Sequence, residues 1–212
     1  MKIFKQETKK SCGIACLRSI FNYYGNNFSE KDIWEKDESY NPNGEKIRNP
    51  ILTLGVTALK FGFDVKYFGY NPIIINENKG DLKESLKNKS KSYFDFGKYY
   101  VDQALQFLEL GGKITIDKLN IKKIKKLIDE NKFILIEIKP AFIGNSSSLN
   151  MNHKVIARGY NKKGFQILDP YDGKKHLWDY DTFLLAFYAA IPELLTIKEK
   201  KSKNILITRI FK

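Results

Sequence analysis

Cysteine, histidine, methionine and tryptophan are scarce in this chain of 212 residues, which contains two of each. Two cysteines are too few for the disulfide framework of a small secreted domain and fit a reducing compartment, so we expect a cytoplasmic protein. The two histidines, His153 and His176, are 23 positions apart, whereas zinc-finger ligands are only a few residues apart. We therefore expect no metal site and no cofactor.

Long apolar runs are also missing. The longest extends from Phe183 to Ile191, far short of the roughly 20 residues that a helix needs to cross a bilayer. The first ten residues carry lysines but no apolar stretch, which is not the pattern of a secretory signal. We expect neither a membrane span nor a signal peptide.

Arginine is rare although the chain is basic, with a net charge of +13. Of its 37 basic residues only four are arginines, namely Arg18, Arg48, Arg158 and Arg209. Nucleic-acid sites depend on arginine for bidentate and stacking contacts, so this balance argues against nucleic acid as the partner. The lysines at 122–126 flank an apolar helical stripe and are expected to be its solvated face. The alternative is attraction to an acidic partner, nucleic acid or anionic membrane.

Hydrophobic residues make up 42% of the chain and aromatic residues 14%, which is the composition of a globular domain. Apolar periodicity and caps predict helices at 12–24, 29–36, 51–61, 93–110, 120–131 and 181–190, with 76–92 loosely helical and 40–50 a loop. Strands are predicted at 64–70, 133–138, 154–160, 165–169, 176–178 and 204–211. Helices dominate the first half and antiparallel strands the second, so we expect an α+β fold in one domain, 1–212.

The first predicted helix begins at a cysteine. Cys12 follows Ser11, a good N-cap, and precedes Gly13, which allows another part of the backbone to approach. The free N–H groups and the positive dipole end of a helix lower the pKa of a thiol, which favours a reactive thiolate. Gln6 precedes Cys12 by one short segment, and its amide together with the Cys12 N–H could form an oxyanion hole. Cys16, one turn later, is expected to be a core residue.

A base and an orienting carboxylate are available in the second half. His153 begins an apolar strand and Asp169, locked by Pro170, ends the next, so Asp169 could orient the imidazole; Asp172 is an alternative. The two side chains share a face only if the hairpin register is shifted by one residue, so that Asp169 lies opposite Val155. We expect a bulge at Gly164 to produce that shift. His176 is expected on a surface strand.

Three segments together resemble the C39 peptidases, which process double-glycine leaders of bacteriocins. They are Gln6-Glu-Thr-Lys-Lys-Ser-Cys12-Gly-Ile-Ala-Cys-Leu17, Asn152-His153-Lys-Val-Ile-Ala-Arg-Gly-Tyr160 and Gly164-Phe-Gln-Ile-Leu-Asp169-Pro170. The resemblance implies a papain-like fold with a helical N-terminal lobe and an antiparallel-sheet C-terminal lobe. By it Cys12 is the nucleophile, His153 the base, Asp169 the orienter and Gln6 the oxyanion residue.

Relative to the compact family domain, residues 70–112 resemble an insertion, and no transporter domain follows, so we expect a stand-alone protein. The aromatic side chains at 93–108 are core in the simplest interpretation, or a wall or lid of the cleft. The expected activity is that of a thiol protease acting on a peptide or protein substrate. Two alternatives remain: an acyltransferase or amidase that uses the same Cys-His-Asp arrangement, and a non-catalytic module that binds a peptide or nucleic acid.

Overall fold

The computed structural model describes residues 1–37, 50–75, 80–143 and 151–200. Helices in these ranges are α1 (Cys12–Tyr23), α2 (Glu30–Lys36), α3 (Ile51–Lys60), α4 (Leu82–Ser92), α5 (Asp95–Glu109), α6 (Ile121–Asn131) and α7 (Tyr180–Ala189), with one short 3₁₀ helix, η1 (Pro140–Ile143). Strands are β1 (Phe63–Gly69), β2 (Lys113–Ile116), β3 (Ile134–Ile138), β4 (His153–Tyr160), β5 (Gly164–Asp169), β6 (Lys174–Asp179) and β7 (Glu193–Glu199).

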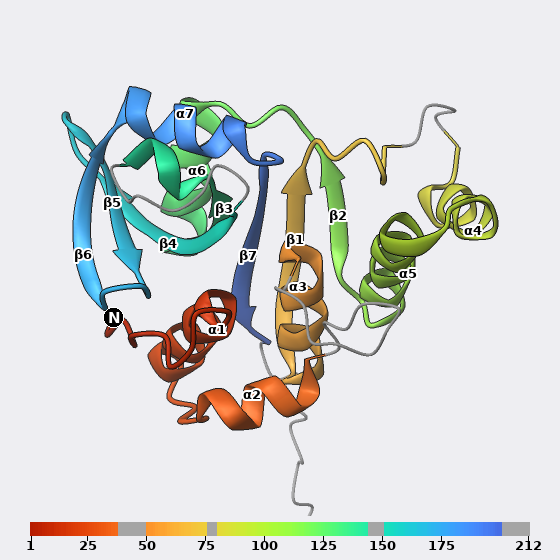
Figure 1. Ribbon diagram of the computed structural model, residues 1–212, viewed down its shortest axis with the longest axis horizontal. Helices are drawn as coiled ribbons and strands as arrows, with labels where there is room; N and C mark the ends of the chain where they lie inside the picture. Colours follow the sequence, from red (N-terminus) through yellow and green to blue (C-terminus); the bar gives the residue numbers. More distant parts are fainter. Residues whose placement is uncertain (38–49, 76–79, 144–150, 201–212) are drawn as a thin grey trace, which may run out of the picture.

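One sheet runs through the whole described structure in the order β2-β1-β7-β3-β4-β5-β6 (Figure 1). All neighbouring strands in it are antiparallel except β1 and β2, which are parallel. Strands from both halves of the chain therefore share the sheet: β1 comes from the half predicted to be mostly helical, and the other described strands come from the second half. The α+β class is as predicted, but the sheet is mixed rather than wholly antiparallel.

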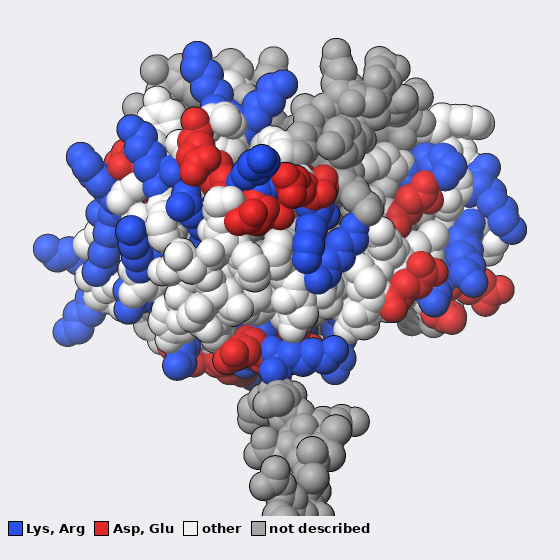
Figure 2. All heavy atoms as spheres, turned by 90° about the horizontal axis from the view of Figure 1, so that it is seen from below, with Lys and Arg blue, Asp and Glu red and all other residues white. Residues whose placement is uncertain are grey.

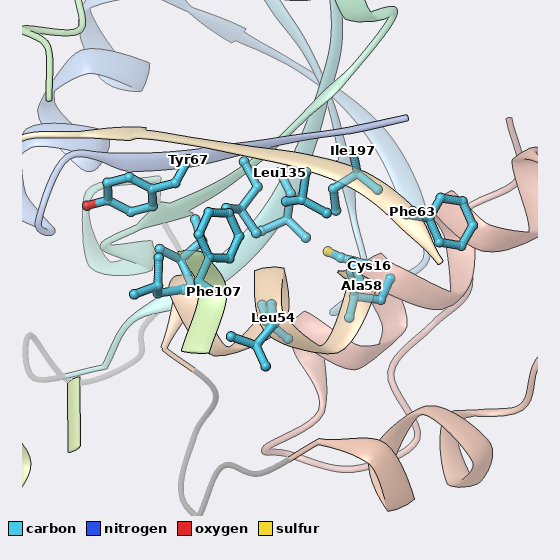
Figure 3. Packing of buried hydrophobic residues seen from close by; sticks show 14 of the residues in the cluster. Cys16, Leu54, Ala58, Phe63, Tyr67, Phe107, Leu135 and Ile197 are labelled. Carbon is cyan, nitrogen blue, oxygen red and sulfur yellow. The ribbon is translucent and has the colours of Figure 1, made fainter. Parts of the chain in front are cut away.

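The sheet is covered on both faces, and each face has its own core. Strand side chains of one face pack with α1, α3 and α5, and those of the other face pack with α6 and α7. Figure 3 shows Leu54 and Ala58 of α3 on one side of the first core, with Leu135 and Ile197 of the strands on the other. Alternation along β4 decides which core each side chain enters: Ile156 joins the first, and Val155 and Ala157 join the second.

Helix α1 begins at Cys12 as predicted and ends where Gly25 adopts φ +88°, a left-handed conformation that terminates helices. Gly13 permits a close approach, but by a side chain rather than by backbone. A Cβ at this position would lie 2.6 Å from Cδ1 of Leu54, on α3. Helix α2 begins with the expected cap, since Ser29 and Asp32 form a reciprocal capping box.

Two strands were not predicted. Strand β7 lies near the middle of the sheet, between β1 and β3, and β2 forms one edge. Glu193 and Lys198 interrupt the apolar pattern of β7, and β2 has only four residues, so neither segment has a clear period-2 signal. The predicted loop at 40–50 falls almost wholly, and the predicted strand at 204–211 wholly, outside the described residues.

Helices α4 and α5 occupy most of segment 70–112 and pack against each other and the first core. Tyr100 and Phe107 of α5 are buried there with exposed fractions of 4% and 0%. Tyr100 and Phe107 therefore belong to the core, as the simpler interpretation predicted, whereas Phe94, directly before α5, is 81% exposed. Within the described ranges, each helix is too short or too polar to span a bilayer.

The lysines of α6 lie on its solvent-facing side, where at least one of them is paired with an acidic residue. Its buried face contains Ile124, Leu127 and Ile128, and lysines lie outside it, as predicted. Lys123 pairs with Asp117 at 2.7 Å. Seen from below, basic residues gather toward the side of β5 and β6, and acidic residues are interspersed among them (Figure 2).

Candidate active site

Cys12 lies at the first position of α1 and is 7% exposed. The preceding Ser11 takes the N-cap position, but its hydroxyl makes no capping bond to the helix, contrary to expectation. Instead the hydroxyl donates to the carbonyl of Thr8 at 3.1 Å and accepts the Thr8 N–H at 3.0 Å. No acidic side chain occupies the first turn of α1 either. The N–H groups and positive dipole end of the helix thus remain available at Cys12.

His153 begins β4 and Asp169 ends β5, and their side chains meet. Nε2 of His153 lies 2.6 Å from Oδ1 of Asp169, in a site where the two residues are 8% and 3% exposed. The same Oδ1 accepts the backbone N–H of Tyr171 at 2.8 Å. The carboxylate is therefore fixed from two directions, and it holds the imidazole in one orientation.

The hairpin register has the predicted one-residue shift, but the bulge is on the other strand. Tyr160 pairs directly with Phe165, and the shift occurs between Ala157 and Gly159 of β4. Beyond it Ile156 pairs with Leu168, and continuing this register places Asp169 opposite Val155. The prediction of a bulge at Gly164 is therefore wrong.

Close packing of β6 against the start of β5 explains why Gly164 does not form the bulge. Gly164 pairs with Asp179, and a Cβ at Gly164 would lie 1.9 Å from the carbonyl oxygen of Trp178. The extra residue is instead Arg158, whose side chain is exposed. A bulge is tolerated at that position because the extra residue can point its side chain into solvent.

The imidazole of His153 also interacts with the Cys12 thiol. Burial raises the pKa of Cys12, but a hydrogen bond to His153 and the positive charge of that ring bring the pKa below its ordinary value. Burial lowers the pKa of His153, yet the hydrogen bonds to Asp169 and Cys12 raise it to about 9. Since Nε2 is engaged by Asp169, Nδ1 is left for the thiol. The two shifts favour a thiolate–imidazolium pair at neutral pH.

Gln6 lies next to this pair through its backbone. Its N–H donates to the carbonyl of Pro170 at 2.8 Å, which fastens the N-terminal segment to the turn after Asp169. In the side chain, Nε2 donates to the Thr8 carbonyl at 2.8 Å. Its second N–H has no partner among the described residues. One donor of the amide is thus bonded within the N-terminal segment, and the other remains for a ligand.

The other candidates are engaged elsewhere. Cys16 is fully buried, and burial raises the pKa of its thiol well above the ordinary value. Its Sγ donates to the backbone carbonyl of Lys154 at 3.5 Å, so it is the core residue expected. Asp172 pairs with His176 at 2.9 Å on the half-exposed start of β6 and does not orient His153. In the part of the chain that the structure describes, no cluster of three or more His, Cys, Asp or Glu side chains could hold a metal ion.

Three residues at or beside the site were not predicted from the sequence. The Tyr171 ring stands edge-on to His153, with centroids 6.5 Å apart, and is 60% exposed. Its place two residues after Asp169 is the only sequence signal for it. Glu137 and Lys154 form a buried ion pair beside His153. A charged residue inside each of two apolar strands was a signal for them.

Comparison with known proteins assigns the chain to a family. The family model of the Peptidase_C39 like family matches residues 1–193. The chain belongs to this family. A comparison with curated proteins finds none that matches.

Two solved structures share the fold. One is the peptidase domain of Streptococcus ComA, a bifunctional ABC transporter involved in a quorum-sensing pathway. It is 13% identical with a TM-score of 0.56, over 94% of this chain and 98% of that one. The other is a double-glycine-motif protease from an AMS/PCAT transporter in complex with the leader peptide. It is 15% identical with a TM-score of 0.51, over 93% and 91% of the two chains. The expected papain-like peptidase fold is confirmed.

Proposed function

We propose that this protein is a cysteine peptidase that hydrolyses peptide bonds through an acyl-enzyme on Cys12. The single observation that carries the proposal is the buried Cys12–His153–Asp169 arrangement, in which the pKa of the thiol is lowered and that of the imidazole is raised to about 9. Family membership supports peptidase chemistry. Two free cysteines, both buried, are compatible with the cytoplasmic location proposed for it.

Each residue has a distinct role in the proposed reaction. The Cys12 thiolate attacks the substrate carbonyl, and the resulting oxyanion lies between the Cys12 N–H and the remaining N–H of the Gln6 amide. The His153 imidazolium donates its proton to the leaving amine, and the neutral ring then removes a proton from water. Hydroxide attack on the thioester releases the acid and returns the thiolate. Asp169 keeps the ring oriented throughout.

The proposed substrate is a peptide. One structural neighbour was solved with a leader peptide bound, and an extended chain could lie across the site between α1 and the ends of β4 and β5. Amidase and acyltransferase reactions would use the same acyl-enzyme, so they differ in what attacks it. We propose that water is the acceptor of the acyl group.

The test combines peptide cleavage with product analysis. The wild-type protein and Cys12→Ala are incubated with a mixture of synthetic peptides, with and without glycine ethyl ester, and products are identified by mass spectrometry. We expect cleavage by the wild type only, with free carboxyl products even when the ester is present. Cleavage unchanged in Cys12→Ala would overturn the proposal, and products dominated by the amine adduct would assign the chain to the acyltransferases.

A further inference from the structure

Two buried charges lie beside the site without belonging to the four residues described. Glu137 of β3 and Lys154 of β4 are direct partners in the sheet, and Nζ of Lys154 lies 3.1 Å from Oε2 of Glu137. They are 7% and 3% exposed. Burying such a pair costs desolvation, and an apolar pair of similar volume is often at least as stable. Stability alone therefore does not account for the pair.

The Glu137 carboxylate is bound by both chain neighbours of His153, the candidate base. Its Oε2 receives Lys154, and its Oε1 accepts from Nδ2 of Asn152. These two residues flank His153, which itself pairs with Ile138 in the ladder. The carboxylate thus holds the ammonium group of Lys154 in one place at the start of β4.

Lys154 faces the side of the sheet on which α1 lies. Glu137 lies two residues after Leu135, and Lys154 two residues before Ile156, so each points to the same face as that neighbour. Leu135 and Ile156 both enter the core shared with α1 and α3. The Lys154 carbonyl accepts the Cys16 thiol of α1. A backbone hydrogen bond from Lys154 is also among the causes that lower the pKa of the Cys12 thiol. The backbone of Lys154 therefore contacts α1, and its side chain lies on the same face of the sheet as that helix.

We propose that the ammonium group of Lys154, held in place by Glu137, is a second positive charge that stabilises the Cys12 thiolate alongside His153. The inference rests on the proposed function, because it concerns the same nucleophile. Lys154 acts here through its field and through its backbone N–H, and it takes no proton in the reaction. The thiolate then depends on two cations, one of which is not the catalytic base.

The charged groups around Cys12 are consistent with this role. From β4 the thiol faces His153 and Lys154, and from its own helix it faces the neutral Cys16 thiol. Burial raises the pKa of Cys12, and the charges of His153 and Lys154 are both among the causes that lower it. Asp169, from β5, faces His153 on the far side of the ring.

The charged groups around Lys154 keep it positive. It faces Glu137 from β3, Glu193 from β7 and Cys12 from α1. Burial lowers the pKa of Lys154, but the charge and hydrogen bond of Glu137 and the charge of Cys12, with that of Glu193 when it is ionised, raise the pKa above its ordinary value. Burial also raises the pKa of Glu193 to about 7. Below that pH Glu193 is mostly neutral, so it does not cancel the field of Lys154.

The test measures the rate of Cys12 alkylation by iodoacetamide against pH, with the modified residue identified by mass spectrometry. Cys16, fully buried, should stay unmodified and reports that the fold is intact. Lys154→Met removes the charge, and Glu137→Gln/Lys154→Met removes it without leaving an unpaired carboxylate. Both should move the midpoint upward by at least about half a pH unit, as expected for loss of a nearby charge. Glu137→Gln alone should not raise it.

The controls separate this inference from the proposed function. Lys123→Met breaks an ion pair on α6, away from the site, and should leave the midpoint unchanged. His153→Ala should raise the midpoint. If the wild type already has an ordinary thiol midpoint, the proposed function fails. If the wild-type midpoint is low and the double variant shares it, only the role of Lys154 is overturned.

Two further outcomes also decide the inference. A shift in Lys154→Met that disappears in the double variant would contradict it, because the unpaired Glu137 carboxylate would then be the cause. If the double variant exposes Cys16, the neutral pair Glu137→Gln/Lys154→Gln, which can form an amide hydrogen bond, takes its place. An upward shift in that pair supports the second cation, and a wild-type midpoint overturns it.

Discussion

The backbone N–H of Gln6 donates to the carbonyl of Pro170 at 2.8 Å. This bond joins the segment that leads into Cys12 with the turn that follows Asp169, although Gln6 and Pro170 are 164 positions apart in the sequence. In Figure 1 the N-terminus lies beside the lower ends of β5 and β6. The bond thereby joins the segment of the candidate oxyanion donor, Gln6, to the turn that follows the carboxylate bonded to His153.

Gln6→Ala should lower kcat and leave KM nearly unchanged, because in the proposed mechanism the lost donor binds the oxyanion rather than the ground-state peptide. Removal of one such donor costs about 10²–10³-fold in kcat. Steady-state kinetics on a peptide cleaved by the wild type measures this. Cys12 alkylation should be unaffected, and Lys5→Ala, an exposed change in the same segment, is the control. A fall of less than about threefold would remove Gln6 from the mechanism.

Asp169→Asn should move the alkaline limb of the pH profile to lower pH. In the wild type the pKa of His153 is about 9, partly through its bond to Asp169. Loss of the negative partner lowers that pKa, so the imidazolium is lost earlier as pH rises. The profile of kcat/KM against pH measures the shift. Asp172→Asn, which affects the partner of His176, is the matched control; an equal shift in both variants would contradict the assignment of Asp169.

Glu193→Gln should flatten the dependence of stability on pH between about 5 and 7. Burial, with the nearby Glu137, raises the pKa of Glu193 from 4.5 to about 7, against hydrogen bonds from Tyr100 and Asn71. The folded state therefore binds more protons than the unfolded state in this range. Its free energy of unfolding falls as pH rises through it, by about 3 kcal/mol.

Urea unfolding of the wild type and Glu193→Gln at pH 5 and pH 8 measures this difference. The gap between the two proteins matters, because His153 also contributes: its raised pKa gives stability that is present below its unfolded value and lost as pH rises through about 9. Glu130→Gln, an exposed change on α6, is the control. A constant gap between wild type and Glu193→Gln would refute the shift of Glu193.

Gly164→Ala should destabilise the β5–β6 pairing, because the added Cβ would lie 1.9 Å from the Trp178 carbonyl, a backbone atom that cannot move alone. We expect a loss of roughly 1–3 kcal/mol, as for other overpacked sites. Gly159→Ala is the matched control, since there the nearest atom is the flexible end of Gln166 at 3.4 Å. Thermal unfolding compares the two, and equal midpoints would show that the strand shifts freely.

The sequence was sufficient where the determinants are local. The start of α1 at Cys12, its end at Gly25, the cap of α2 at Ser29 and the hairpin at 161–164 follow from apolar periodicity, glycines and a cap within a few residues, although Ser11 itself makes no capping bond. The four candidate site residues, Gln6, Cys12, His153 and Asp169, were also proposed from their positions in or beside predicted elements. Bonding within a short window determines these features, so a linear pattern contains them.

Long-range pairing limited the prediction. Strand β7 was missed because its first residue, Glu193, is charged in the linear pattern but buried in the fold. Its carboxylate is accommodated by Tyr100 and Asn71, both far away in sequence. The bulge was misplaced for a related reason: Trp178, on the next strand, blocks Gly164, and nothing in the hairpin itself indicates that contact.

The sequence by itself determined which groups are present, which elements carry them and that the protein resembles a thiol peptidase. Only the tertiary structure decided that His153 and Asp169 share a face, that Ser11 leaves the helix N-terminus uncapped, and that Lys154 and Glu137 form a buried ion pair. A strand side chain changes face with each shift of one residue in register. That register is set by contacts between segments distant in the chain, so it exists only once the sheet has formed.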